Sequence, residues 1–230
     1  MGQADARLLD KTAIRDAATI IMLRDAETRP RVLMGQRGRT AAFMPSKFVF
    51  PGGAVDAVDA TIPLARAARA EMAAQLAAKA EAPANAVIAA ATRELWEETG
   101  LLLGRTDERA GRLEAPRGWR GYLATGHLPD GPTLEFIFRA ITPPGRPRRF
   151  DARFFVADAS DLANDPDDFS RAEDELSHLQ WVPLDTARAF DMPFITEVVL
   201  AELAARLNGT AHHGVPFFNN ADRISRFERL

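Results

Sequence analysis

The chain has 230 residues and a formal net charge of −3, so bulk binding to nucleic acid through a basic surface is not expected. Hydrophobic residues make up 47% of the sequence, enough for a full core, and the absence of cysteine excludes disulfides and thiolate metal sites. No apolar run approaches the roughly 20 residues of a membrane span and the N-terminus lacks a signal-peptide core, so we expect a cytoplasmic protein without a membrane partner.

Short apolar runs near the N-terminus predict three strands. Residues 17–23 form an apolar, β-branched run, the turn residues after them are typical of a hairpin, and residues 31–36 are predicted as its return strand. Residues 48–50 form a third short strand, which Pro51 and the following Gly52-Gly53 pair would end.

The rest of the chain alternates between helical and strand patterns. Residues 61–80 are rich in alanine and carry apolar residues at helical spacing, whereas residues 105–120 are polar and predict a loop. Further predictions are strands at 133–141, 149–156 and 179–182, an amphipathic helix at 195–207 and no clear element at 208–230. This order of elements fits an α/β fold, an α/β/α sandwich around a mixed sheet.

Residues 86–98 predict another helix because they contain neither glycine nor proline. Asn85 can cap its start, and Gly100 is suited to the left-handed conformation that ends helices. Pro83 separates this helix from the alanine-rich one before it.

Three carboxylates share one face of this helix, because Glu94, Glu97 and Glu98 are spaced i, i+3 and i+4. Like charges at this spacing repel, and anions in a last turn oppose the helix dipole. A hard cation such as Mg²⁺ would offset both costs, because it prefers oxygen ligands. A solvated acidic helix end is the alternative, and the spacing alone does not decide between them.

The residues around these glutamates resemble a known motif. Arg93-Glu-Leu-Trp-Glu-Glu-Thr-Gly-Leu101 matches the second half of the Nudix box, G-x5-E-x7-R-E-U-x-E-E-x-G-U, where U is aliphatic, and Phe50-Pro-Gly-Gly53 resembles its opening. The chain therefore resembles the Nudix hydrolases over residues 48–101. This resemblance implies a single Nudix domain over residues 1–230, with a helical insertion inside the box at about 57–84 and a C-terminal helix and tail at about 195–230.

The spacing within the box departs from the family pattern. Arg93 follows Gly53 by 40 positions, where the plain box has 14, so about 26 residues are inserted. Counting forward from Gly53 places the first acidic position of the box at Asp59, and counting back from Arg93 places it at Asn85. Neither is glutamate, and both alternatives stay open. We expect the inserted residues to form a helical lobe at the mouth of the active site.

The resemblance implies a pyrophosphohydrolase that cleaves a nucleoside diphosphate linked to another moiety, NDP-X to NMP plus P-X, with Mg²⁺ or Mn²⁺. The implied metal ligands are Glu94, Glu97, Glu98 and the backbone of Gly53. The implied catalytic residues are Glu97, Glu98, Glu175 and Arg93, with Arg93 orienting the glutamates. The proton of the attacking water would pass to a box glutamate or to Glu175, which lies in an acidic loop before the 179–182 strand.

Arginines are the expected contacts for the substrate phosphates, because guanidinium suits bidentate phosphate binding. Arg37 and Arg149 are the first candidates, and Arg148 and Arg153 are the second; solvated surface arginines are the alternative for each. The long insertion resembles the branch that includes acyl-CoA diphosphatases, so CoA or acyl-CoA is one expected substrate. Nucleotide sugars, ADP-ribose and NADH stay open.

The expected partner is therefore a small nucleoside diphosphate derivative and not a nucleic acid, and the chain is compatible with a homodimer. The alternative class is a Nudix module that senses a nucleotide without hydrolysing it. Loss of box glutamates would favour that class, and none of the three is lost.

Overall fold

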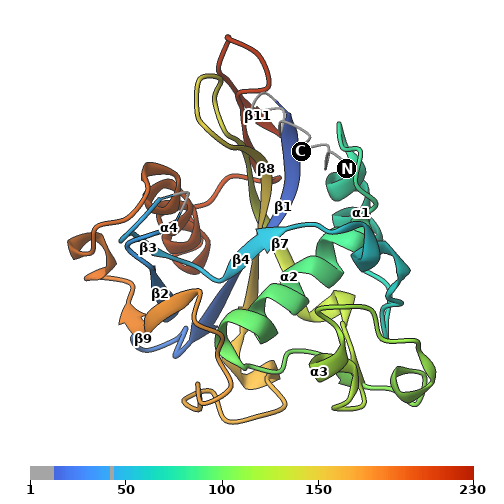
Figure 1. Cartoon of the computed structure of the whole chain (residues 1–230). Coiled ribbons are helices and arrows are strands. Elements are labelled where there is room, and N and C mark those ends of the chain that lie inside the picture. Colours follow the sequence, from blue (N-terminus) through green and yellow to red (C-terminus); the bar gives the residue numbers. More distant parts are fainter. Residues whose placement is uncertain (1–12, 42–43) are drawn as a thin grey trace, which may run out of the picture.

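The computed structural model describes residues 13–41 and 44–230, and a mixed sheet runs through the middle of this part of the chain (Figure 1). Its nine strands are β1 (Ile14–Arg24), β2 (Arg31–Arg37), β3 (Phe48–Val49), β4 (Gly52–Ala54), β7 (Glu135–Ile141), β8 (Arg149–Asp158), β9 (Leu176–Pro183), β10 (Pro216–Asn219) and β11 (Arg226–Arg229). The order is β11-β10-β7-β8-β1-β2-β3, with β4 also paired to β1 and β9 to β2.

Strand β1 lies inside the sheet, between β8 and β2, and its middle is buried on both faces. It runs parallel to β8 over its whole length, from Ile14 opposite Arg149 onward, and forms the predicted antiparallel hairpin with β2. Burial on both sides explains why its sequence is a continuous apolar run rather than an alternating one. Strand β4 pairs with the middle of β1, where Ala18 lies opposite Gly53.

Helices cover both faces of the sheet, as predicted for an α/β/α sandwich. Ile20 and Met22 share a core cluster with residues of α1 (Ala70–Ala77) and α2 (Ala84–Thr99). Their neighbours Ile21 and Leu23 point to the other face and share a cluster with α4 (Phe194–Leu207). Among the described residues, no helix has the length and apolar character needed to cross a bilayer.

The ends of α2 agree with the sequence prediction at one terminus only. Gly100 adopts the left-handed conformation with φ of 74° and ends the helix, as predicted. The predicted cap at Asn85 is wrong: the helix begins at Ala84, and Pro83 is the N-cap residue, without a side-chain hydrogen bond. Proline can stand there because it has no N–H to satisfy and its fixed φ suits the entry to a helix.

The insertion contains less α-helix than the single helix that the sequence predicts over residues 61–80. It holds a 3₁₀ helix, η1 (Ala57–Thr61), and the eight-residue α1, whose Met72 and Leu76 are buried in the core. Arg139 of β7 donates to the carbonyls of Ala78 and Lys79 just after α1 and fixes the end of that helix. Helix α1 is therefore part of the core and not a lobe at the mouth of the site, whereas η1 lies beside the box helix.

Residues 105–133 fold against the outer side of α2. They contain β5 (Arg105–Thr106), η2 (Ala110–Arg112), α3 (Arg120–Leu123), β6 (His127–Leu128) and η3 (Gly131–Thr133). Trp119 and Tyr122 are fully buried in a small core of their own, and Trp96 of α2 packs edge-on against Tyr122. The remaining short helices are η4 (Ala159–Asp161) and η5 (Ala187–Ala189).

The prediction of no clear element at 208–230 is wrong, because strands β10 and β11 extend the sheet there. Strand β10 runs parallel to β7, with Phe217 opposite Arg139, and β11 pairs antiparallel with β10. Phe217 is buried, and the guanidinium of Arg139 lies 4.4 Å from its ring centre. The tail is thus an integral part of the sheet.

Phe217→Ala should therefore destabilise the protein by about 3–5 kcal/mol, the usual cost of removing a buried phenylalanine side chain. Phe227→Ala is the matched control, because Phe227 on β11 is 62% exposed and should change stability by less than about 0.5 kcal/mol. Urea unfolding at neutral pH measures both, and equal effects would show that the tail is not folded into the sheet.

Candidate active site

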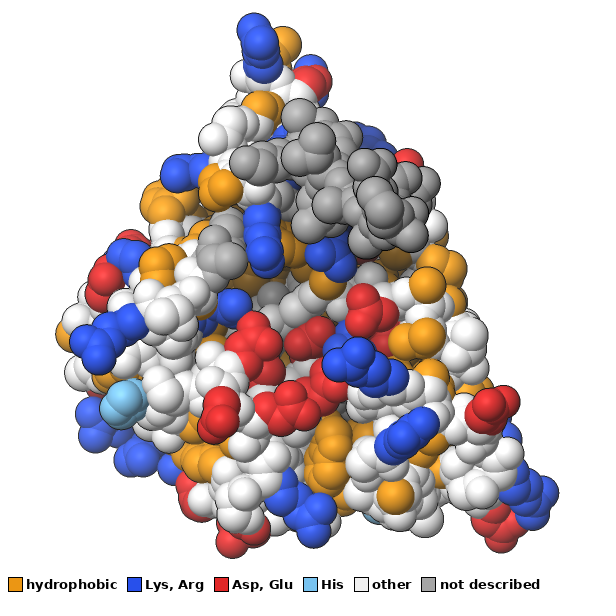
Figure 2. Space-filling view, viewed as in Figure 1, with side chains coloured by type: hydrophobic (Ala, Val, Ile, Leu, Met, Phe, Trp, Pro, Cys, Tyr) orange, Lys and Arg blue, Asp and Glu red, His pale blue; other side chains and the backbone are white. Residues whose placement is uncertain are grey.

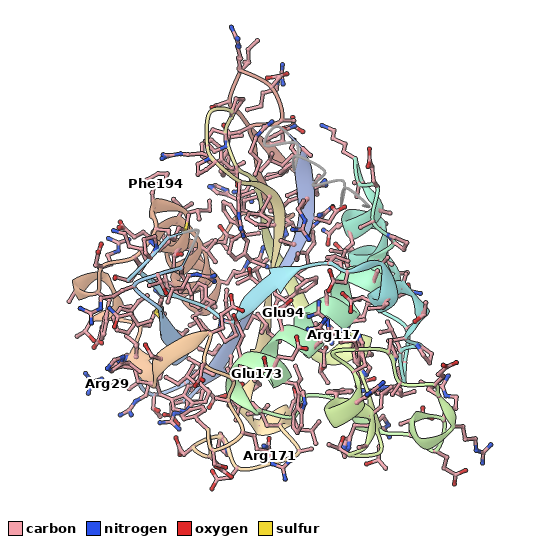
Figure 3. All side chains as sticks on the ribbon, in the orientation of Figure 1. Arg29, Glu94, Arg117, Arg171, Glu173 and Phe194 are labelled. Carbon is pink, nitrogen blue, oxygen red and sulfur yellow. The ribbon has the colours of Figure 1, made fainter. Side chains whose placement is uncertain are left out.

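The three box glutamates lie on the last turns of α2, where Glu94 and Glu98 approach the glycine pair of β4; Glu94 is labelled in Figure 3. The backbone N–H of Gly52 donates to Glu98 Oε2 at 2.8 Å. A Cβ atom added to Gly53 would lie 2.5 Å from the carboxylate of Glu94, so a side chain there would displace that carboxylate. Gly53 therefore leaves room for the helix carboxylate to approach the strand backbone closely.

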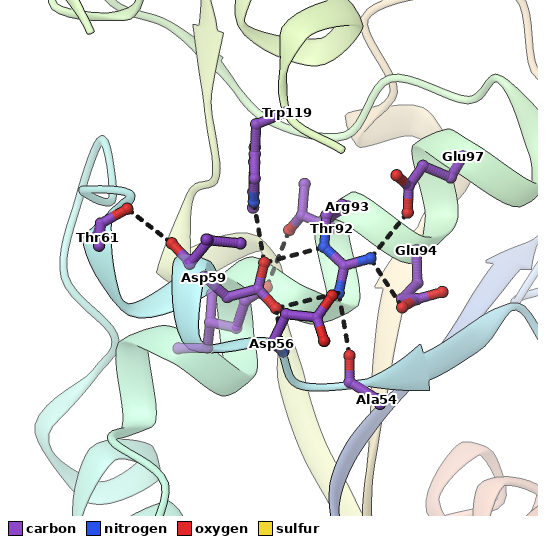
Figure 4. Close-up of polar contacts among 11 residues, drawn as sticks. Ala54, Asp56, Asp59, Thr61, Thr92, Arg93, Glu94, Glu97 and Trp119 are labelled. Atoms are coloured by element: carbon purple, nitrogen blue, oxygen red, sulfur yellow. Dashed lines mark hydrogen bonds and ion pairs between the residues drawn. The ribbon is translucent and has the colours of Figure 1, made fainter. Parts of the chain in front are cut away.

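Arg93 joins the glutamates to the rest of the site (Figure 4). Its side chain is buried, and its Nε and Nη2 atoms donate to the two carboxylate oxygens of Asp59 at 2.9 and 3.0 Å. Nη2 also donates to the carbonyl of Ala54, while Nη1 donates to Glu94 at 2.9 Å and to Glu97 at 2.8 Å. One guanidinium thus fixes the positions of strand β4, helix η1 and two of the three glutamates.

Asp59 is fully buried and accepts two more hydrogen bonds, from the backbone N–H of Asp56 at 2.8 Å and from Trp119 Nε1 at 2.9 Å. These contacts place Asp59 at the first acidic position of the box. Asn85 does not occupy it, because it lies two turns before Arg93 on the same helix, about 12 Å along the axis. Sequence reasoning missed Trp119, although a tryptophan in a polar loop is itself a sign of local burial.

Glu98 presents an oxygen that no described residue satisfies. Its Oε1 atom is buried without a hydrogen-bond partner, whereas its Oε2 accepts from Gly52. Burial raises the pKa of Glu98 well above its usual range, and the charge of Glu94 adds to the effect. Burial likewise raises the pKa of Glu94 to about 7, because Arg93 beside it offsets only part of the desolvation.

This donor set fits a hard divalent cation. The available atoms are carboxylate oxygens, one of them buried and unpartnered, and Mg²⁺ binds oxygen ligands. Within the described ranges, however, no three acidic or histidine side chains already converge closely enough to hold an ion. Here Arg93 holds the carboxylates of Glu94 and Glu97 by hydrogen bonds from Nη1.

The acidic loop before β9 lies against the box helix. The backbone N–H of Glu173 donates to the carbonyl of Glu97 at 2.9 Å. The charge of Glu175 is among the causes that raise the pKa values of Glu94 and Glu98, so it acts on the same cluster. The structure therefore brings Glu175 to the neighbourhood of the box glutamates.

The candidate phosphate-binding arginines have different positions. Arg37, at the end of β2, donates from Nη2 to Glu175 at 2.9 Å and so lies at the site. Arg149 lies at the start of β8, about 13 Å along the strands from the level of Gly53, and donates to the carbonyls of Thr142, Asn220 and Ala221. Arg153 is fully buried and pairs with Asp16. The structure does not bring Arg149 and Arg153 to the box glutamates.

The sequence model of the NUDIX domain matches residues 13–203. The chain belongs to the Nudix family. It is 29% identical over 180 residues to the putative nudix hydrolase 7 of Caenorhabditis elegans. The match covers 73% of this chain and 51% of that protein. The chain therefore spans about half the length of this curated relative. The crystal structure of a NUDIX hydrolase from Alicyclobacillus acidocaldarius superimposes with a TM-score of 0.60 and 29% identity, covering 84% of this chain and 92% of that one.

Asp59→Asn should destabilise this Nudix chain by about 3–5 kcal/mol, because it removes the buried partner of a buried guanidinium. Asp56→Asn is the matched control: its side chain is 56% exposed and 3.9 Å from Arg93, so the expected loss is below about 1 kcal/mol. Chemical unfolding compares the two variants, and similar losses would contradict the assignment of Asp59 as the partner on which Arg93 depends.

Proposed function

We propose that this chain hydrolyses a nucleoside diphosphate derivative, NDP-X to NMP plus P-X, with Mg²⁺ or Mn²⁺. The observation that carries the proposal is the buried Oε1 of Glu98, which has no hydrogen-bond partner among the described residues, beside Glu94 and the backbone of Gly53. Membership of the Nudix family supports it, because Nudix hydrolases cleave this kind of linkage.

The ligands of the cation would be Glu94, Glu97 and Glu98, with the backbone of Gly53. A cation held there would supply Lewis-acid chemistry and would neutralise charge that develops on the phosphate oxygens. Arg93 contributes by orienting two of these glutamates, since its Nη1 donates to both. The glycine pair contributes space, because any side chain at Gly53 would displace Glu94.

Glu175 is our candidate for the general base, with a box glutamate as the alternative. The backbone N–H of Glu173 donates to α2 and so restrains the loop that carries Glu175, and Arg37 restrains the carboxylate of Glu175. A glutamate that binds a cation is a poorer base, because the positive charge lowers its pKa. A carboxylate outside the ligand set is better suited to take the proton of the attacking water.

Arg37 is also our remaining candidate among the predicted phosphate contacts, because it lies at the site while Arg149 is engaged elsewhere. For the group attached to the diphosphate, CoA or acyl-CoA is the lead, and it rests on the position of the insertion within the box. Nucleotide sugars, ADP-ribose and NADH are the other candidates. A module that binds a nucleotide without hydrolysis is the alternative class, and the three retained glutamates argue against it.

A panel of acetyl-CoA, CoA, ADP-ribose, NADH and UDP-glucose, each with Mg²⁺ or Mn²⁺, tests the proposal by the appearance of AMP or UMP, or of adenosine 3′,5′-bisphosphate from the two CoA compounds. We expect hydrolysis of at least one compound, and its loss in excess EDTA. Glu98→Gln should abolish it while the fold survives. Glu108→Gln, which removes a 93% exposed carboxylate, is the matched control and should keep wild-type turnover. Full activity of Glu98→Gln would contradict the metal site.

Glu175→Gln should lower kcat by roughly 10²–10⁴-fold, the usual contribution of a general base, with little change in Mg²⁺ activation. Asp174→Asn, a substitution of the neighbouring exposed carboxylate, should have little effect. The measurement is a pH–rate profile of each variant together with a Mg²⁺ titration. A loss of less than about tenfold, with the acidic limb of the profile intact, would return the base role to a box glutamate.

A further inference from the structure

A positively charged side chain lies at the edge of the acidic cluster without a partner among the described residues. On the face shown in Figure 2, acidic side chains gather in the middle and basic ones border them. Figure 3, in the same orientation, labels Arg117 and Glu94 close together in this view, and Gly118, the next residue after Arg117, lies against Glu97. Arg117 is exposed, and within residues 13–41 and 44–230 its guanidinium makes no hydrogen bond or ion pair.

The residues that follow Arg117 hold it at this position. Gly118 lies against the site: a Cβ atom added to it would be 3.0 Å from Glu97 Oε1 and 3.2 Å from Arg93 Cδ. Gly118 has φ of 89°, a conformation that favours glycine. Trp119 is fully buried, and its indole N–H donates to Asp59. The backbone on the C-terminal side of Arg117 is therefore fixed to the same cluster that orients the glutamates.

The two other arginines at the site already have partners. Arg93 is buried and uses its three nitrogen atoms on Asp59, Ala54, Glu94 and Glu97. Arg37 pairs with Glu175. A diphosphate that approaches so many carboxylates needs positive charge besides a cation, because like charges repel. Among these three arginines, Arg117 has its hydrogen-bond donors available.

We propose that Arg117 binds a phosphate oxygen of the substrate and so helps determine the preference for diphosphate compounds. The inference rests on the substrate class of the proposed function. The contact would come from residues 116–119, outside the box, and would be separate from the cation ligands. Guanidinium is suited to this role, because its planar donors match the oxygens of a phosphate.

The test uses methylene diphosphonate, a diphosphate analogue that cannot be hydrolysed, and measures its binding by calorimetry in the presence of Mg²⁺. Arg117→Ala should raise its Kd by about 10- to 100-fold, the range for a charge-assisted hydrogen bond. Arg117→Lys, which keeps the charge without the fork, should lose less. Arg112→Ala is the matched control, because Arg112 is an exposed arginine of the same segment that pairs with Glu108. The Kd of this variant for methylene diphosphonate should stay within about twofold of the wild-type value.

For any compound of the panel that is hydrolysed, Arg117→Ala should act on KM more than on kcat, and the loss should shrink at high salt. A Kd within about twofold of wild type in Arg117→Ala would overturn the inference, as would absence of detectable binding to the wild-type protein. The two proposals fail separately. Hydrolysis that is insensitive to Arg117 removes this inference alone, and binding that depends on Arg117 without hydrolysis of any compound removes the proposed activity alone.

Discussion

The site depends on one buried ion pair, between Arg93 and Asp59. A guanidinium can be buried only when its charge is compensated and its donors are satisfied, and Asp59 meets both needs with two hydrogen bonds. Through this pair, α2 is joined to η1, to the carbonyl of Ala54 in β4 and to Trp119. The same guanidinium then restrains Glu94, so the arrangement of the glutamates follows from a contact outside the carboxylate cluster.

Much of the site could be predicted from sequence, because the spacing of neighbouring residues decides which side chains meet there. Glutamates at i, i+3 and i+4 must share a helix face, and a glycine pair must allow close approach. Asp59 was ambiguous, since the insertion gave two ways to count. Trp119 was missed although a tryptophan in a polar loop signals local burial, and Arg117 could not be predicted because it lies in an irregular segment whose position is set by burial of that aromatic side chain. Arg149 resembled a phosphate ligand in sequence but binds backbone carbonyls.

The fold was predictable where a pattern is long and local. The apolar run of β1, its hairpin partner and the antiparallel β7–β8 pair were all recognisable. The alanine-rich insertion was predicted as one long helix, since alanine favours helix everywhere, yet the α-helix it forms is limited to α1, where apolar residues reach the core. Strands β10 and β11 are four residues each, and β10 pairs with β7, which is distant in sequence, so no local signal marks them.

The central claim is that the buried carboxylates at the end of α2 are completed by a divalent cation. Titration with Mn²⁺ in the absence of substrate, followed by the electron paramagnetic resonance signal of free Mn²⁺, tests it without reference to turnover. We predict that the wild-type protein binds Mn²⁺ and that Glu98→Gln, which alters the unpartnered buried oxygen donor, loses most of this binding, while Glu108→Gln retains it. Absence of Mn²⁺ binding by the wild type, or equal binding by all three proteins, would contradict the account.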